Sequence, residues 1–203
     1  MTRKQGPFHI GDHRFFIAYN AVKGAFVFLQ FADKVLAAYP GGATPAEQKT
    51  ARDLTRDSAF GWNAWAWARL QTKTGKSKVF LYYFDEKAEI PAGSEGAGYG
   101  ARHASELPYV FRQLTEHGRP APTPQDEALS DMMRTCWTNF AKTGDPNGTG
   151  LPNWPAYNDA MPQMLHIEVG NTKAGPMVNV NGLKVLDAYS ASRRAHEASP
   201  AAH

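Results

Sequence analysis

The stretch GYGARHASELPYVF, residues 98–111, decides the fold of this chain. Its glycines, Gly98 and Gly100, permit backbone angles that a Cβ would obstruct, so they predict a tight bend just before His103. A short amphipathic turn is expected directly after that histidine. Because histidine has an unperturbed pKa of about 6.5, one that is held on such a loop can exchange a proton near neutral pH. A single histidine does not by itself identify a catalytic site.

The segment before this loop predicts a strand of the central sheet. Residues 78–84, KVFLYYF, are almost continuously apolar or aromatic, which is typical of a strand covered on both faces in an α/β fold. A loop rich in Gly, Ala, Glu and Pro follows over residues 85–98. Ligands of such sheets bind beyond the carboxyl ends of the strands, and the order of segments predicts that His103 lies there.

Helices are predicted on both sides of this strand and loop. Thr44, Pro45 and Glu47 form an N-terminal capping pattern that predicts a helix over residues 45–56. Apolar residues continue at helical spacing from Phe60 to Leu70.

The strongest helix pattern begins at Thr123-Pro124 and stops at Gly144. Its apolar stripe is made of Leu129, Met132, Met133, Cys136, Trp137, Phe140 and Ala141. Residues 165–169 alternate in polarity and predict a short strand, whereas the composition of residues 188–203 predicts a frayed tail.

Three blocks of the sequence resemble one known family in order and spacing. GARHASELPYVF (100–111) is similar to the histidine loop of the type-B carboxylesterases, the branch of the α/β-hydrolases that includes the cholinesterases. LSDMM (129–133) with WTNFAKTGDPNG (137–148), and GLPNWPAY (150–157), resemble the late helix of that family and the turn after it. The resemblance implies an α/β fold in which residues 1–187 form the C-terminal portion of an α/β-hydrolase, with an incomplete central sheet and packed helices.

The resemblance also implies roles for single residues. It makes His103 the general base of a Ser-His-Glu triad, with no cofactor and a small-molecule ester as substrate. By the same resemblance Glu106 is a supporting carboxylate rather than the triad acid. The helical region around Phe60 and Trp62 lies near the mouth of the active-site gorge in that family. An acyl-pocket role for these two residues is therefore one alternative to simple packing.

The other parts of a serine esterase are missing from the sequence. The nucleophile elbow G-x-S-x-G does not occur; the nearest match, AGSEG at residues 92–96, places Ser94 after a loop and before more glycines, where no helix can start. Residues 1–24 contain no Glu, and Asp12 is their one carboxylate. We therefore expect a fragment of a serine carboxylesterase that is inactive as an isolated chain. The alternative is a non-catalytic, cholinesterase-like binding or scaffold protein.

Composition excludes several other classes of function. A formal charge of +3 and scattered basic residues do not favour nucleic acid, and no apolar run is long enough to cross a membrane. Cys136 is the one cysteine and no signal peptide is evident, which slightly favours the cytoplasm. His9 and His13 lie four apart, but Gly11 and the lack of a third ligand argue against a metal site. We expect self-association through the apolar face that a missing N-terminal part would cover.

Overall fold

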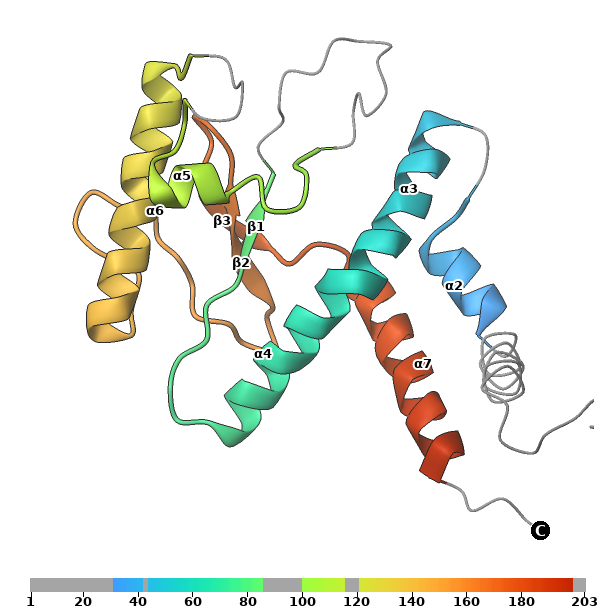
Figure 1. The fold of residues 1–203 in the computed structure, drawn as a ribbon. Helices are drawn as coiled ribbons and strands as arrows, with labels where there is room; N and C mark the ends of the chain where they lie inside the picture. Colours follow the sequence, from blue (N-terminus) through green and yellow to red (C-terminus); the bar gives the residue numbers. More distant parts are fainter. Residues whose placement is uncertain (1–30, 42–43, 86–99, 116–120, 199–203) are drawn as a thin grey trace, which may run out of the picture. The chain divides into compact units, whose positions relative to one another are not determined.

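The computed structural model describes two compact units of the chain (Figure 1). The described residues are 31–41, 44–85, 100–115 and 121–198. One unit comprises residues 64–179, and the other combines the residues up to Asn63 with those from Val180 onward. Every helix in these described stretches is too short or too polar to cross a bilayer.

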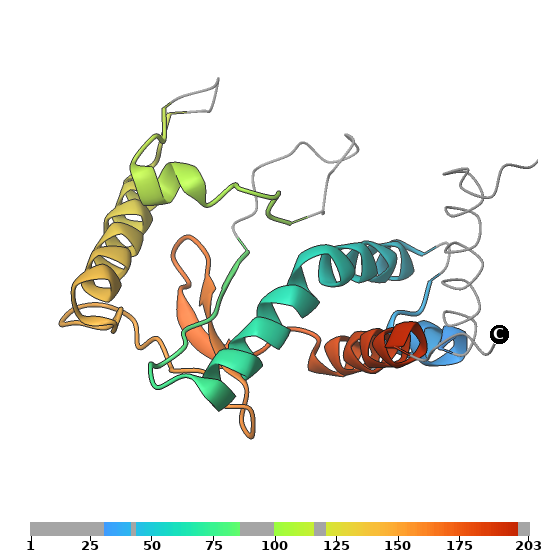
Figure 2. The same cartoon turned by 60° about the horizontal axis from the view of Figure 1, so that its bottom comes forward.

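A three-stranded sheet lies at the centre of the 64–179 unit. Strand β1 (Tyr82–Phe84) pairs in parallel with β2 (Gln163–Ile167), and β2 pairs in antiparallel fashion with β3 (Lys173–Pro176). Figure 2 shows β2 and β3 as a hairpin. The register sets Tyr82 opposite Leu165. The strand predicted over residues 78–84 is confirmed for Tyr82–Phe84, but it is not covered on both faces, because β1 lies at one edge of the described sheet and Tyr82 is 38% exposed. The strand predicted over residues 165–169 lies two residues earlier, at Gln163–Ile167.

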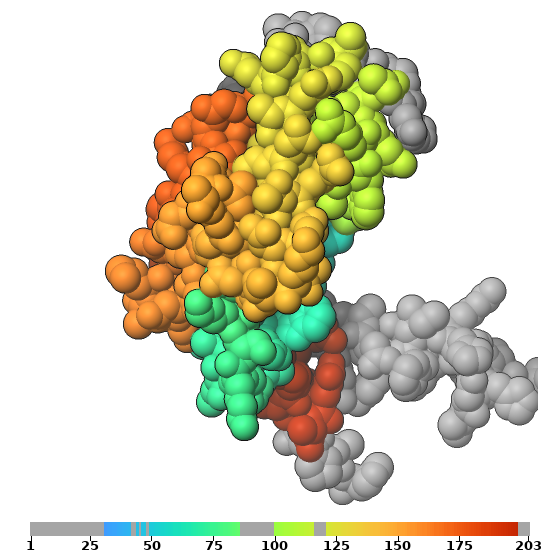
Figure 3. Space-filling model, turned by 90° about the vertical axis from the view of Figure 1, so that its left-hand side faces the viewer, coloured from blue at the N-terminus to red at the C-terminus, as the bar shows by residue number. Residues whose placement is uncertain are grey.

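Two helices pack beside each other against this sheet. They are α5 (Leu107–Phe111) and α6 (Pro124–Thr143), which lie side by side in Figure 3. Helix α6 begins at the predicted cap, where Thr123 Oγ1 accepts a hydrogen bond of 3.2 Å from the backbone N–H of Asp126. It ends at Gly144, which has φ +74°. The predicted helix is confirmed at both ends.

The core of the unit lies between α6 and β2. Met133 of α6 and Leu165 and Ile167 of β2 have no exposed surface, and Cys136 is 1% exposed. Burying a side chain of this size completely stabilises the fold by about 1.5–3 kcal/mol. The remaining buried members of the cluster are Tyr109, Leu114, Leu129 and Trp154. Cys136 thus has the buried, apolar position that the helical pattern predicts.

The second unit is helical in its described part. It contains α2 (Ala32–Ala38), α3 (Pro45–Arg56), the π-helical turn η1 (Asp57–Gly61) and α7 (Val180–Ala198), with the start of α4 (Trp62–Thr74). The predicted capping box of α3 is present between Thr44 and Glu47. The buried carboxylate of Asp57 accepts a hydrogen bond of 3.0 Å from Tyr39 and pairs with Arg56 at 2.7 Å.

Residues 188–198 of the predicted tail form the end of α7, which continues to Ala198. Two leucines three positions apart, Leu183 and Leu186, are 2% and 7% exposed and anchor the helix. Alanine is the best helix former, so the Ala-rich composition after Asp187 supports the helix rather than ending it.

Candidate functional site

His103 lies in a tight turn that leads into α5, and its side chain is exposed. The turn is closed by backbone hydrogen bonds from Ser105 to Arg102 (3.1 Å) and from Leu107 to Ala104 (3.2 Å). The hydroxyl of Ser105 donates a further bond of 2.7 Å to the Arg102 carbonyl. These contacts fix the backbone on both sides of the histidine. We call residues 102–106 the histidine turn.

Two residues around the histidine have left-handed backbone angles. Gly100 has φ +74°, which confirms the predicted need for glycine before the histidine. Ala104, directly after His103, has φ +65° although it carries a Cβ. An alanine in this region costs about 1–2 kcal/mol, so the surrounding contacts must hold it there. The sequence gives no signal for this strain, because alanine is not a turn residue.

The segment before the histidine turn returns to the carboxyl end of the parallel strands. A Cβ built on Gly100 would lie 3.6 Å from Oδ1 of Asp85, the residue that follows β1. The Asp85 N–H in turn donates to the carbonyl of Ile167, the last residue of β2, at 2.9 Å. In Figure 1 the chain passes beside the end of β1 before it enters α5. His103 therefore follows a segment at the sheet edge where ligands of α/β proteins bind.

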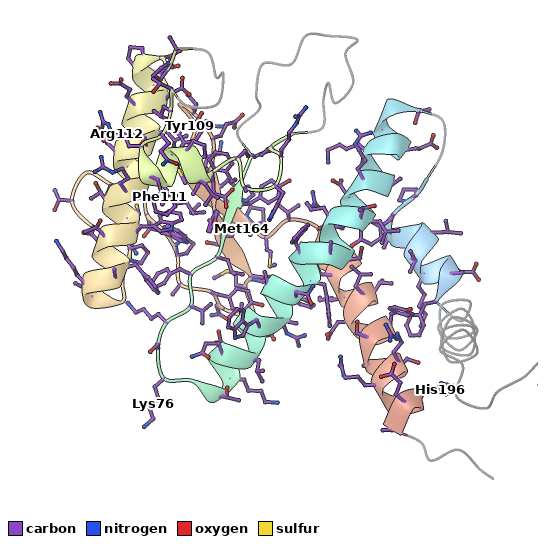
Figure 4. The ribbon with its side chains drawn as sticks, viewed as in Figure 1. Lys76, Tyr109, Phe111, Arg112, Met164 and His196 are labelled. Atoms are coloured by element: carbon purple, nitrogen blue, oxygen red, sulfur yellow. The ribbon has the colours of Figure 1, made fainter. Side chains whose placement is uncertain are left out.

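Helix α5 is held against α6 by polar contacts. The Tyr109 hydroxyl donates to Asp126 at 2.9 Å, and buried Ser130 donates to the Tyr109 carbonyl at 2.6 Å. Arg112 forms an ion pair with Asp131. Figure 4 labels Tyr109 and Arg112 where the two helices meet. Because α5 starts four residues after His103, these contacts also limit the movement of the histidine turn.

Glu106 is the carboxylate nearest to His103 along the chain. Its charge acts on the hydroxyl of Tyr82 on β1. Desolvation of that hydroxyl, together with the charge of Glu106, raises the pKa of Tyr82. Tyr82 was not singled out by the sequence, since nothing distinguishes it from the other aromatic residues of the predicted strand.

The other histidines in the described ranges have separate environments. His166 Nε2 lies 2.8 Å from the Pro176 carbonyl, and its ring covers Gly175, where an added Cβ would approach to 2.9 Å. This histidine therefore supports the β2–β3 pairing. His196 is exposed in the last turn of α7. No group of three potential metal ligands occurs among the residues that the structure describes.

Other residues considered from the sequence fall into two groups. His9, Asp12, His13 and Ser94 lie outside the described residues. Trp62 donates from Nε1 to Asp187 at 3.1 Å and packs on the core of its unit, whereas Phe60 is 54% exposed. Trp62 is therefore engaged in packing, and the acyl-pocket role stays a prediction for both residues.

Comparisons of the sequence with known proteins point to one family. A family model described as the carboxylesterase family matches residues 18–184. Carboxylesterase 5A of Canis lupus familiaris is 34% identical over 125 residues, which cover 58% of this chain and 22% of that protein. Cocaine esterase of Homo sapiens is 32% identical over 130 residues, which cover 63% of this chain and 23% of that protein.

A solved structure is similar as well. The carboxylesterase of Geobacillus stearothermophilus superposes with a TM-score of 0.60 and 25% identity, over 76% of this chain and 31% of that one. The prediction of a partial α/β-hydrolase fold is confirmed. The chain spans less than a quarter of the length of the two relatives and less than a third of the solved enzyme.

Proposed function

Because this chain belongs to the carboxylesterase family, we propose that it supplies the histidine of a serine ester hydrolase, with His103 as the general base. The position of the histidine turn supports this role. The segment before it meets Asp85 at the carboxyl end of β1, and the side chain of His103 is exposed rather than packed in the core. An imidazole in such a place can reach a substrate and exchange protons with it.

In the proposed reaction a serine hydroxyl attacks the carbonyl carbon of a small carboxylic ester. His103 takes the serine proton as the new C–O bond forms, and then returns it to the departing alcohol. The acyl-enzyme is hydrolysed by the same two transfers, with water in place of the alcohol. The chemistry needs no cofactor.

We propose that the serine and the triad acid lie on polypeptide beyond these residues. The sequence contains no G-x-S-x-G motif, and the chain spans 22% of the length of carboxylesterase 5A. Glu106 is not assigned as the acid, because it follows His103 by only three residues and the resemblance to the family makes this position a supporting carboxylate. On this proposal the 203 residues are a fragment and have no esterase activity alone.

The experiment compares variants of the full product of the native gene, including any coding sequence upstream of Met1. Hydrolysis of p-nitrophenyl esters is measured for the wild type, for His103→Ala and for His196→Ala, an exposed histidine in the last turn of α7. We expect His103→Ala to reduce kcat/KM by about 10³-fold or more, because loss of a triad member removes most of the acceleration. His196→Ala should retain activity. Full turnover by a folded His103→Ala protein would overturn the assignment.

A second function, that of a non-catalytic binding or scaffold protein, is favoured by one observation. The nucleophile motif is absent from the sequence. This alternative predicts that the product of the native gene neither hydrolyses esters nor becomes labelled by a fluorophosphonate, which reacts covalently with activated serines. Labelling at a serine outside residues 1–203 would instead support the proposal that the serine lies on polypeptide beyond these residues.

We also propose that the isolated chain self-associates. Two apolar side chains three positions apart on α4, Trp67 and Leu70, are 73% and 58% exposed. Exposed apolar side chains that share a helix face favour association. Sedimentation velocity should show a dimer or larger species that dissociates when both residues are replaced by serine. A monomer at all concentrations would contradict this proposal.

A further inference from the structure

The two edges of the described sheet differ in their ability to accept another strand. Strands β1 and β3 are the outer strands, on either side of β2. The edge of a sheet presents backbone N–H and C=O groups that pair readily with a further strand, and proteins block an edge with proline or charged side chains where the sheet ends. The outward backbone groups of each outer strand therefore indicate whether the sheet is complete on that side.

The edge at β3 is blocked. The Leu165 N–H of β2 donates to the Leu81 carbonyl at 3.0 Å, so the backbone groups of Leu165 face β1. In an antiparallel pair such a residue lies opposite one whose backbone groups also point away from the pair, and that residue is Ala174. Two positions further along β3, Pro176 faces outward as well and has no N–H to donate. Exposed Lys173 adds a charge at the start of the same strand.

The edge at β1 carries no such block. The Leu81 carbonyl and the Asp85 N–H both bond to β2, at 3.0 and 2.9 Å. Tyr83 lies midway between them and faces β2 in the same way, because backbone groups alternate in direction along a strand. The N–H and C=O groups of Tyr82 and Phe84 therefore point to the outer side. Among the described residues β2 is the one strand that pairs with β1, and β1 contains neither proline nor a charged residue.

The side chains of the two outward-facing residues hold β1 in place for pairing. The ring centroid of Tyr82 lies 5.3 Å from that of Trp137 and 6.0 Å from that of Trp154. The ring centroid of Phe84 lies 5.5 Å from that of Tyr109 on α5. Tyr82 nevertheless remains 38% exposed. Three aromatic residues in parallel pairing are typical of the interior of a sheet rather than of an exposed edge.

We propose that a further strand pairs with β1 through the backbone groups of Tyr82 and Phe84, and that this strand belongs to the polypeptide that carries the catalytic serine. The identity of this partner rests on the proposed function, whereas the open edge does not. The chain spans 22% of carboxylesterase 5A and 31% of the solved Geobacillus enzyme, so most of such an enzyme lies outside these residues. A second copy of the chain fits less well, because two three-residue edges make few contacts and a stable interface buries about 1,200 Å² or more.

Hydrogen exchange of single backbone amides tests this pairing. The full product of the native gene, including any coding sequence upstream of Met1, is compared with the 203-residue chain at low concentration, and exchange is resolved to single residues by mass spectrometry. In the 203-residue chain we expect slow exchange at Tyr83 and Asp85 and fast exchange at Tyr82 and Phe84. In the full product the last two amides should slow by about 100-fold or more, whereas Ala174, on the blocked edge, should stay fast.

Three outcomes would overturn the inference. Fast exchange at Tyr82 and Phe84 in the full product would mean that no strand pairs there. Slow exchange at both residues in the dilute 203-residue chain would mean that its own residues cover the edge. Protection that increases with the concentration of that chain would identify a second copy as the partner.

A pair of proline variants gives a matched control, because proline removes one outward N–H from either edge without removing a bond to β2. In the full product, Tyr82→Pro should speed exchange at Phe84 by about tenfold or more, and Ala174→Pro should leave it unchanged. Melting curves establish that each variant is folded, and the comparison of the two wild-type proteins decides the question if Tyr82→Pro is not. These readouts do not involve turnover, so their failure is distinguishable from a failure of His103→Ala to reduce activity.

Discussion

Ala104, which follows His103, has a left-handed backbone angle, so replacing it by glycine should stabilise the folded protein. Ala104 has φ +65°, a conformation that costs an alanine about 1–2 kcal/mol and glycine almost nothing. Replacing alanine by glycine also increases the freedom of the unfolded chain, which costs about 0.4–1 kcal/mol. We therefore expect Ala104→Gly to stabilise the protein by about 0.8 kcal/mol, where such a change in a loop normally destabilises.

Ala101 is the control for this prediction. It lies in the same loop, three residues earlier, and is not among the residues with positive φ. Ala101→Gly carries the unfolded-state cost alone, so we expect it to destabilise by about 0.4–1 kcal/mol. The difference between the two variants, about 1.5 kcal/mol, isolates the cost of the left-handed angle because the unfolded-state effect cancels.

The assay is thermal and urea unfolding of the wild type and both variants, followed by tryptophan fluorescence. In a chain of about this size, 1 kcal/mol moves Tm by roughly 2–4 °C, so the two variants should differ by several degrees and lie on either side of the wild type. Equal melting temperatures for the two variants, or a less stable Ala104→Gly protein, would refute the left-handed turn at this position.

Four further predictions concern the rest of the fold. Burial raises the pKa of the Cys136 thiol to about 11, so Ellman's reagent at pH 8 should label it only after denaturation. Ser130→Ala removes the bond to the Tyr109 carbonyl and should cost about 1–2 kcal/mol in urea unfolding, since the site is buried. Thr123→Ala removes the cap of α6 and should cost about 1 kcal/mol in the same assay. Burial raises the pKa of Tyr157 to about 12, which favours its neutral form in the fold; this stabilisation is complete below pH 10 and should disappear as the pH rises through 12, with no such loss in Tyr157→Phe.

The sequence predicts α3 and α6 well because their signals are local. A helix cap requires only residues within four positions of one another, and Thr44 with Glu47, or Thr123 with Gly144 at the far end, mark the boundaries directly. The apolar stripe of α6 has the same local character. These local signals mark where the helices begin and end, whereas packing on the rest of the chain supplies most of their stability.

The features that the sequence did not reveal depend on pairing between distant segments. The run KVFLYYF predicts a strand, but only the register with β2 decides which aromatic side chain faces α6. A shift of one residue would bring Tyr83 to the position of Tyr82. The strained angle at Ala104 is equally hidden, because it results from contacts of the whole turn and not from the preference of alanine.

The same dependence on distant segments explains why the role of one block cannot be read from its sequence alone. The block WTNFAKTGDPNG contains no group that could act on an ester, and it reads as a helix end and a turn. In the structure its Asn147 fixes Trp154, whose ring lies against Tyr82 of β1. A turn more than sixty residues from β1 in sequence therefore helps to hold an aromatic ring of that strand. Asn147 both donates to and accepts from the backbone of Trp154, so its amide fixes the position from which that aromatic ring packs.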